Sequence, residues 1–322
     1  MFHDSSIRGI LTGLRFWRGL LYIRGMSATT APQADAAPPL DPALLAAVES
    51  ALTAFLNAQT LPENLRAACL HAVLAGGKRL RPMLVLESAM AAGGRVEDAM
   101  PAAVAIEFVH AFSLVHDDLP ALDNDSMRRG KPTCHVAFGE AMAILAGDCL
   151  LSLAPLSAAR CPFNGSAIGH ELMDATTRMI AGQVYDTLQG FPEGLSEQAK
   201  LELVHHNKTG ALLECSCRRG ALAAGADAET LARLTSFGRA IGLMFQVVDD
   251  LIDATQTAEH AGKATGKDAE AGKLTYPVVH GIEGSRREVE RLRLQAVDAL
   301  APLGTRGERL TKLVEFLARR TK

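Results

Sequence analysis

Residues 98–125 read DAMPAAVAIEFVHAFSLVHDDLPALDND, an apolar segment rich in alanine that runs directly into four aspartates. Alanine, leucine and methionine favour helices, so we expect a helix over residues 98–117. Carboxylates this close together repel one another, which costs stability unless cations join them. The stretch therefore indicates a helix that ends in a cation-binding loop, with a polar loop of helix caps as the alternative.

Segments of the same kind extend in both directions from this helix. Hydrophobic residues make up 48% of the 322-residue chain and aromatic residues only 5%, and alternating β-branched runs are nearly absent. Because no strand pattern separates the apolar segments, we expect a single all-α domain. The other helices are expected at residues 64–75, 82–92, 136–159, 167–189, 196–224, 227–255, 275–283, 286–302 and 306–320.

The first 40 residues differ from the rest of the chain. Arginines and apolar residues are interleaved over residues 1–25, and residues 27–40 are rich in Ala and Pro. The basic amphipathic stretch is typical of a transit peptide or a membrane-surface helix, unless translation starts at Met26. We expect residues 1–40 to be a disordered extension and residues 41–322 to be the folded domain, which starts with Asp41 as a helix cap before Pro42.

The composition argues against several classes of protein. A formal net charge of −3 gives no general attraction to nucleic acid. No run of about eighteen uncharged apolar residues is present, which argues against stable membrane insertion. The six cysteines lack zinc-ligand spacing, so we expect buried, reduced thiols in a cytoplasmic protein.

A second acidic cluster, QVVDDLID over residues 246–253, also ends an apolar helix. Asp249 and Asp253 are one helical turn apart, about 40° around the axis, and can face one cation together. In the first cluster Pro120 forbids a continuous helix, so the chain must bulge there to bring Asp123 back beside Asp117. Hard oxygen ligands of this kind suit Mg²⁺, which completes its shell with water and phosphate oxygens.

Basic residues accompany glycines at four places along the chain. Three cations follow two glycines in GGKRLRP at 76–82, RRGKP at 128–132 follows the first acidic cluster, and Lys208 interrupts a helix. Lys263, Lys267 and Lys273 follow the second cluster in a glycine-containing segment. Solvated surface charge is the alternative for each, but their pairing with two acidic clusters favours a diphosphate plus Mg²⁺.

Motifs of other enzyme classes are missing. The chain has no Walker or Rossmann glycine fingerprint, no G-x-S-x-G elbow and no H-E-x-x-H. His205 and His206 are adjacent, so their side chains diverge on a helix, and we expect them at the helix surface. Hydrolytic zinc is therefore not supported.

The two acidic motifs, Gly76–Pro82 and Arg128–Thr133 together resemble the trans-isoprenyl diphosphate synthases, in the correct order over residues 45–285. The D-D-x-x-x-x-D form of the first motif is similar to the group that holds bacterial farnesyl and plant or bacterial geranylgeranyl diphosphate synthases. The resemblance implies a polyprenyl synthase domain over 41–322, a bundle of antiparallel helices around a deep central cavity, and a homodimer. Terpene cyclases have a different second motif, so cyclisation is disfavoured.

The resemblance also implies a role for each site residue. Three Mg²⁺, replaceable by Mn²⁺, would be bound by Asp117, Asp123 and Asp249, with Asp118 and Asp253 in support. The allylic diphosphate would contact Arg128, Lys208 and Lys263. Isopentenyl diphosphate would contact Lys78, Arg81, His110 and Arg129. The reacting centre would be lined by Thr209 and Gln246, with Gln183 and Asp186 near the substrates.

The chemistry implied is ionisation of the allylic C–O bond, attack by the isopentenyl double bond, and proton loss to the released pyrophosphate. Phe112 precedes Asp117 by five residues, about 7.5 Å along a helix. In the family a bulky residue here stops the chain near fifteen carbons, so we expect farnesyl diphosphate from dimethylallyl and geranyl diphosphate. The alternatives are a geranylgeranyl diphosphate synthase, a non-catalytic partner subunit, or Phe112 as a plain core residue.

Overall fold

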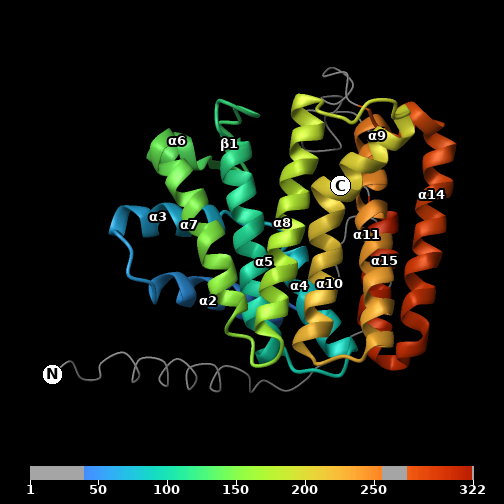
Figure 1. Cartoon of the computed structure of the whole chain (residues 1–322), viewed down its shortest axis with the longest axis horizontal. Helices are drawn as coiled ribbons and strands as arrows, with labels where there is room; N and C mark the ends of the chain where they lie inside the picture. The colour runs from blue at the N-terminus through green and yellow to red at the C-terminus, as the bar shows by residue number, and fades with distance from the viewer. Residues whose placement is uncertain (1–39, 256–273, 321–322) are drawn as a thin grey trace. The chain divides into compact units, whose positions relative to one another are not determined.

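The computed structural model describes residues 40–255 and 274–320 of the chain (Figure 1). The expectations for the N-terminal extension and for Lys263, Lys267 and Lys273 lie outside the described residues. Over the described part the chain is helical apart from one short hairpin, so the predicted all-α class is confirmed. The first elements are α2 (Pro42–Asn57), α3 (Glu63–Val73), α4 (Leu80–Ala91), α5 (Val96–Asp117), β1 (Met127–Arg128) and β2 (Lys131–Pro132).

The elements after the hairpin form the second part of the bundle. They are α6 (Cys134–Phe138), α7 (Glu140–Ala158), α8 (Gly165–Leu188), α9 (Glu197–Val204), the π-helical η1 (His205–Gly210), α10 (Ala211–Ala223), α11 (Ala228–Thr255), α14 (Tyr276–Leu300), the 3₁₀ turn η2 (Ala301–Gly307) and α15 (Glu308–Arg319). Helix α5 packs on α4 and α7, α10 packs on α4 and α11, and α11 packs on α14.

The first helix shows why the sequence pattern is reliable here. The Ala43 N–H donates to the Asp41 carboxylate at 2.9 Å, so Asp41 caps the helix as expected. Leu44, Val48 and Leu52 on the predicted apolar face are all buried. Helix formers spaced at helical period thus bury one face, which stabilises the helix through packing.

Helix α5 runs through the hydrophobic core and delivers the first acidic cluster. Its side chains are buried almost continuously from Ala99 to Phe112. In Figure 1, α5 and α11 both run toward the upper end of the bundle, where each ends in its acidic cluster. The fold therefore places the two clusters at one end of the bundle.

Several local features depart from the expected helices. Instead of two helices at 275–283 and 286–302, the structure has α14 alone, with a non-helical φ of 70° at Gly281. The segment 136–159 is broken at Gly139, whose φ of 86° leaves the helical region, and η1 interrupts the segment 196–224. A two-stranded hairpin follows the first acidic cluster, and its turn residues Arg129 and Gly130 both have positive φ, 53° and 76°. Positive φ at both positions is the pattern of a type I′ turn, which joins short antiparallel strands.

Two described helices, α5 and α7, have the length and hydropathy of a membrane span. Most of α5 is buried in the bundle, which identifies it as a core helix. Helix α7 is less buried and exposes Ile144, Leu145 and Leu156. An apolar helix face left exposed is typical of an interaction surface.

Candidate active site

The loop after α5 returns the chain to the end of that helix. The Asp123 N–H donates to the Asp117 carbonyl oxygen at 2.9 Å, and the Asn124 N–H donates to the Leu119 carbonyl oxygen at 3.1 Å. Asn124 has a φ of 50°, in the left-handed region that asparagine tolerates. The bulge predicted at Pro120 is confirmed, and it brings the backbone of Asp123 against that of Asp117.

The Asp117 carboxyl group lies in a partly dehydrated position. Burial raises its pKa to about 6; Lys208 opposes the rise, and Asp123 adds to it. A group whose charged form is disfavoured in this way gains most from a bound cation. Asp117 therefore has the environment of a metal ligand.

Asp118 is buried and belongs to a different arrangement. Arg128 Nε donates to its two carboxylate oxygens at 2.8 and 2.9 Å, and Arg128 Nη2 donates to Oδ1 at 2.5 Å. This bidentate contact holds the hairpin against the end of α5. In the described structure Asp118 therefore binds Arg128, and its expected support of a metal stays a prediction.

The second acidic cluster carries an arginine that sequence reasoning missed. Arg320 follows α15, and its Nη2 donates to Asp249 Oδ1 at 2.6 Å and to the Phe245 carbonyl oxygen at 2.9 Å. Its guanidinium carbon lies 3.9 Å from the centroid of the Phe245 ring. Arg320 stands in the basic run RRTK at 319–322, and no glycine or acidic residue beside it indicates which group it contacts.

Asp250, between the two predicted ligands of this cluster, points into the protein. Its Oδ2 accepts the Tyr276 N–H at 2.8 Å and lies 3.4 Å from His205 Nε2. The expectation of His205 at the helix surface was wrong, because η1 turns its ring inward against Asp250, whereas His206 is exposed. Asp250 thus links the cluster to the start of α14 and to η1.

The π-helical turn η1 carries Lys208 toward α8. Lys208 Nζ donates to Asp186 Oδ2 at 2.5 Å, so two predicted site residues meet. Gly182 makes this possible, because a side chain there would collide with the Lys208 backbone.

Gln183 Nε2 is buried without a hydrogen-bond partner in the described chain, which leaves a donor for a ligand. Thr209 and Gln246 are half-buried on the neighbouring turns of η1 and α11.

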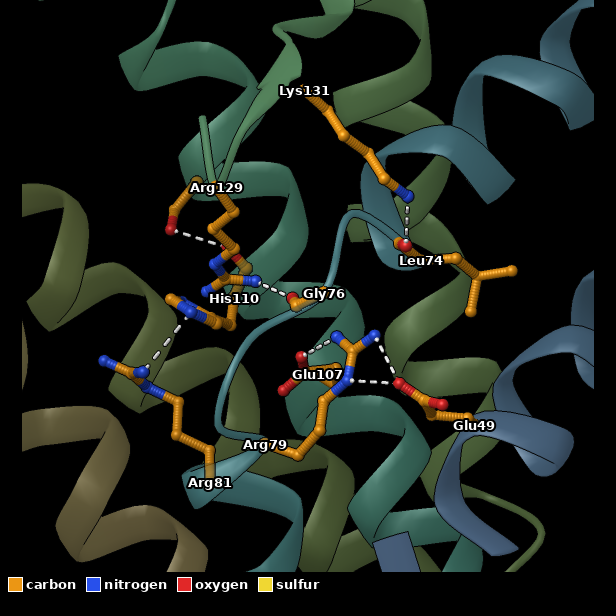
Figure 2. Close-up of polar contacts among 10 residues, drawn as sticks. Glu49, Leu74, Gly76, Arg79, Arg81, Glu107, His110, Arg129 and Lys131 are labelled. Carbon is orange, nitrogen blue, oxygen red and sulfur yellow. Dashed lines mark hydrogen bonds and ion pairs between the residues drawn. The ribbon is translucent and has the colours of Figure 1, made fainter. Parts of the chain in front are cut away.

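Arg81, His110 and Arg129 come together from three elements, as Figure 2 shows. Arg81 Nη1 lies 3.4 Å from His110 Nε2, and Arg129 donates to the Gly76 carbonyl oxygen. Burial lowers the pKa of Arg81 to about 10, and burial together with the nearby arginines lowers the pKa of His110 well below its ordinary value. At pH 7 the cluster therefore presents two cations and a neutral imidazole, with Lys78 exposed in the adjoining turn.

Gly77 is required where it stands. Its φ is 122°, and a side chain there would collide with the guanidinium group of Arg129. Glycine thus lets the turn before α4 approach the hairpin that carries Arg129. The sequence indicated an oxyanion-binding turn here, and the structure supplies the reason for its glycine.

Arg79, the third cation of this turn, faces inward. Its Nη1 lies 2.6 Å from Glu107 Oε1 and its Nη2 lies 3.3 Å from Glu49 Oε1, and the side chains of Arg79 and Glu107 are 3% and 4% exposed.

We expect Arg79→Met to lower the free energy of unfolding by about 3–5 kcal/mol, because Glu107 would stay buried without its cation. Urea unfolding measures this, and a double variant Arg79→Met/Glu107→Gln should recover part of the loss. A loss of less than about 1 kcal/mol in the free energy of unfolding would contradict the view that Glu107 depends on Arg79 as its buried partner.

The aspartate oxygens of the two acidic clusters are hard ligands of the kind that a divalent metal such as Mg²⁺ prefers. Across residues 40–255 and 274–320 no three His, Cys, Asp or Glu side chains converge to hold a metal unaided. Mg²⁺ is commonly bound through one or two carboxylates, with water and substrate phosphates completing the octahedron. Asp117 with Asp123, and Asp249 on the other helix, suit ions that bind together with a diphosphate.

Comparisons with known proteins agree with this geometry. The family model described as polyprenyl synthetase matches residues 62–299. The chain is 44% identical over 256 residues to the large subunit 1 of a heterodimeric geranylgeranyl pyrophosphate synthase from Arabidopsis thaliana, covering 74% of this chain and 67% of that protein. It resembles the crystal structure of a putative farnesyl-diphosphate synthase from Marinomonas sp. MED121, with a TM-score of 0.70, 36% identity, and 85% and 97% of the two chains covered.

A second solved structure, a geranyltransferase from Legionella pneumophila, has a TM-score of 0.73 and 30% identity, with 85% of this chain and 94% of that chain covered. The fold and the paired acidic clusters define a helical prenyltransferase that handles diphosphates with a divalent metal. The chain belongs to the polyprenyl synthetase family, within the trans-isoprenyl diphosphate synthases.

Proposed function

We propose that this chain is a farnesyl diphosphate synthase, which condenses isopentenyl diphosphate with dimethylallyl and then geranyl diphosphate. The observation that carries the product length is Phe112, which is buried on α5, about 1.4 turns before Asp117. The 44% identity to a geranylgeranyl pyrophosphate synthase subunit supports the longer product as the second candidate.

Two separate groups of basic residues would each bind one of the two diphosphate substrates. Arg81, Arg129 and neutral His110 form a compact donor cluster that suits isopentenyl diphosphate, with Lys78 at its edge. Lys208 and Arg128, each already oriented by a carboxylate, suit the allylic diphosphate. From the family resemblance we also propose that Lys263 contacts the allylic diphosphate.

We propose Mg²⁺ as the metal, with three ions held by Asp117, Asp123 and Asp249, and Mn²⁺ as a substitute. When bound, such ions neutralise the charge that develops on the departing pyrophosphate. The side chains then have two tasks, to orient both substrates and to keep water from the allylic cation. Ionisation and attack need no nucleophilic side chain.

The test is a product assay with the purified full chain. The protein is incubated with Mg²⁺, isopentenyl diphosphate and dimethylallyl diphosphate, and the dephosphorylated products are separated by chain length. A fifteen-carbon alcohol that disappears with EDTA is the expected result. A twenty-carbon alcohol would support the second candidate, a hydrocarbon would indicate a cyclase, and no condensation would favour a non-catalytic partner subunit.

We also propose a homodimer that buries the exposed apolar face of α7. Leu156 is 57% exposed and Leu145 is 55% exposed, values that leave large side chains in water. We expect Leu156→Glu to weaken dimerisation by about 100-fold or more, because a charge would be buried at the interface. Light scattering after size exclusion measures this.

The matched control is Leu294→Glu, which makes the same change at an exposed position of α14. It should leave the dimer intact. A dimer that survives Leu156→Glu but not Leu294→Glu would move the interface from α7 to α14.

A further inference from the structure

The arginine at the end of the described chain binds the carboxylate that a metal needs. Arg320 Nη2 lies 2.6 Å from Asp249 Oδ1. The Arg320 side chain is 5% exposed and that of Asp249 is 42% exposed. Asp249 thus accepts a guanidinium hydrogen bond while its side chain stays partly exposed.

The contacts that hold Arg320 at this place are few. Besides Asp249 it has the Phe245 carbonyl oxygen at 2.9 Å and the face of the Phe245 ring, both one turn earlier on α11. Its Nε is buried and has no hydrogen-bond partner in the described part of the chain. A guanidinium group carries five N–H donors, so this arrangement leaves part of its capacity unused. A cation that competes for Asp249 therefore displaces a guanidinium group whose Nε is unsatisfied in its present position.

A space is available beside Arg320. A hollow of about 540 Å³ lies among α11, α14 and α15, and Arg320 is one of its lining residues. Glu290 lines it too, but both of its carboxylate oxygens already accept hydrogen bonds from Arg293, at 2.6 and 2.7 Å. A guanidinium group displaced from Asp249 thus has a hollow beside it that it can enter.

We propose that Arg320 is a positioning residue that occupies Asp249 in the metal-free enzyme and is displaced when a divalent cation binds there. The inference rests on the proposed function, since it takes Asp249 to be a metal ligand. Two cations that compete for one carboxylate are linked thermodynamically, so removing the guanidinium group must raise the affinity for the metal. Arg320 orients the carboxylate and lowers the occupancy of this site when no diphosphate is present.

The test is a titration of the full chain with Mn²⁺, followed by electron paramagnetic resonance of the free ion, with and without inorganic pyrophosphate. Arg320→Met should lower the Kd for Mn²⁺ about fivefold without pyrophosphate, a factor typical of a partly exposed ion pair. Arg320→Lys, which keeps the charge, should remain close to the unchanged protein. Arg319→Met removes the same charge one residue earlier, from a side chain that is 75% exposed and pairs with Glu315, and should change little.

A double variant shows whether the effect acts through Asp249. In the background of Asp249→Asn, Arg320→Met should no longer tighten Mn²⁺ binding. Equal affinity for Arg320→Met and the unchanged protein, or equal tightening by Arg319→Met, would overturn the inference while leaving the metal site in place. If the unchanged protein binds no Mn²⁺ even with pyrophosphate, the proposed use of metal fails, and the inference fails with it.

Discussion

Asp117→Asn is expected to lower kcat/KM for prenyl transfer by about 10³-fold or more, while the protein stays folded. The loss follows because a neutral amide binds a divalent ion poorly, and such an ion contributes several kcal/mol to a transition state that develops charge on pyrophosphate. Initial rates with isopentenyl and geranyl diphosphate at saturating Mg²⁺ measure it. The matched control is Asp174→Asn, the same change at an exposed position of α8, which should cost less than about threefold.

Asp117→Asn should raise the stability of the metal-free protein at neutral pH, although it lowers the activity. The pKa of Asp117 is about 6 in the folded protein, above its ordinary value of 3.8, because burial disfavours the carboxylate. The folded state therefore binds the proton more tightly, and this group costs stability as pH rises from about 4 through 6. Metal-free Asp117→Asn should melt at a higher temperature than the unchanged protein at pH 7.5 and at a similar temperature at pH 4. Lower activity with a lower melting temperature at pH 7.5 would indicate misfolding instead.

The described carboxylates and cations of the site compensate one another in the absence of ligands. Arg128 binds Asp118, Lys208 binds Asp186 and Arg320 binds Asp249. Binding of metal and diphosphates must therefore exchange protein ion pairs for ligand contacts, which moderates the gain in free energy. The arrangement also keeps the cations oriented before any substrate arrives.

Local chemistry explains what could be predicted from the sequence. Alanine and leucine at helical spacing indicate α5 and α11, and the fixed φ and missing N–H of Pro120 require the chain to leave the helix after Asp117. Residue type and spacing likewise indicate that the acidic and basic motifs suit cations and a diphosphate, whereas the role of each residue is an expectation from the family resemblance. These features depend on neighbours in sequence, so one chain is enough to infer them.

What the sequence did not indicate depends on tertiary packing. Arg79 and Arg81 are two positions apart in one basic turn, yet Arg79 is buried against Glu107 and Arg81 faces His110. His205 lies inward because η1 changes the helical phase, and a π-helical turn has no simple pattern in residue type. Arg320 reaches Asp249 only because α15 packs along α11.

The Phe112 ring is held in place beside α7. It packs edge-on against the ring of His116, with centroids 5.8 Å apart. His116 Nε2 lies 3.1 Å from the Ile144 carbonyl oxygen, and the absent side chain of Gly147 leaves room for the imidazole. The phenyl group is thus held by a side chain that is itself fixed to α7, so under the proposed function it would resist displacement by a growing prenyl chain.

Phe112→Ala is therefore expected to change the main product from fifteen to twenty carbons. The substitution removes a six-carbon ring, enough space for one further five-carbon unit of an apolar chain. Chromatography of the dephosphorylated products measures the shift. Removing a buried phenyl group costs about 3–5 kcal/mol of stability, so the melting temperature must be recorded alongside.

Two further variants distinguish a specific effect of the Phe112 ring on product length from a general loosening of the core. Phe112→Tyr keeps the ring and should keep the fifteen-carbon product. Phe108→Leu alters a buried phenyl group one turn earlier on α5, which packs against Phe55 instead, and should lower stability without lengthening the product. If folded Phe112→Ala gives an unchanged product spectrum, Phe112 is a core residue and the stop lies elsewhere. If Phe108→Leu lengthens the product as well, loosening of α5 rather than loss of one ring sets the chain length.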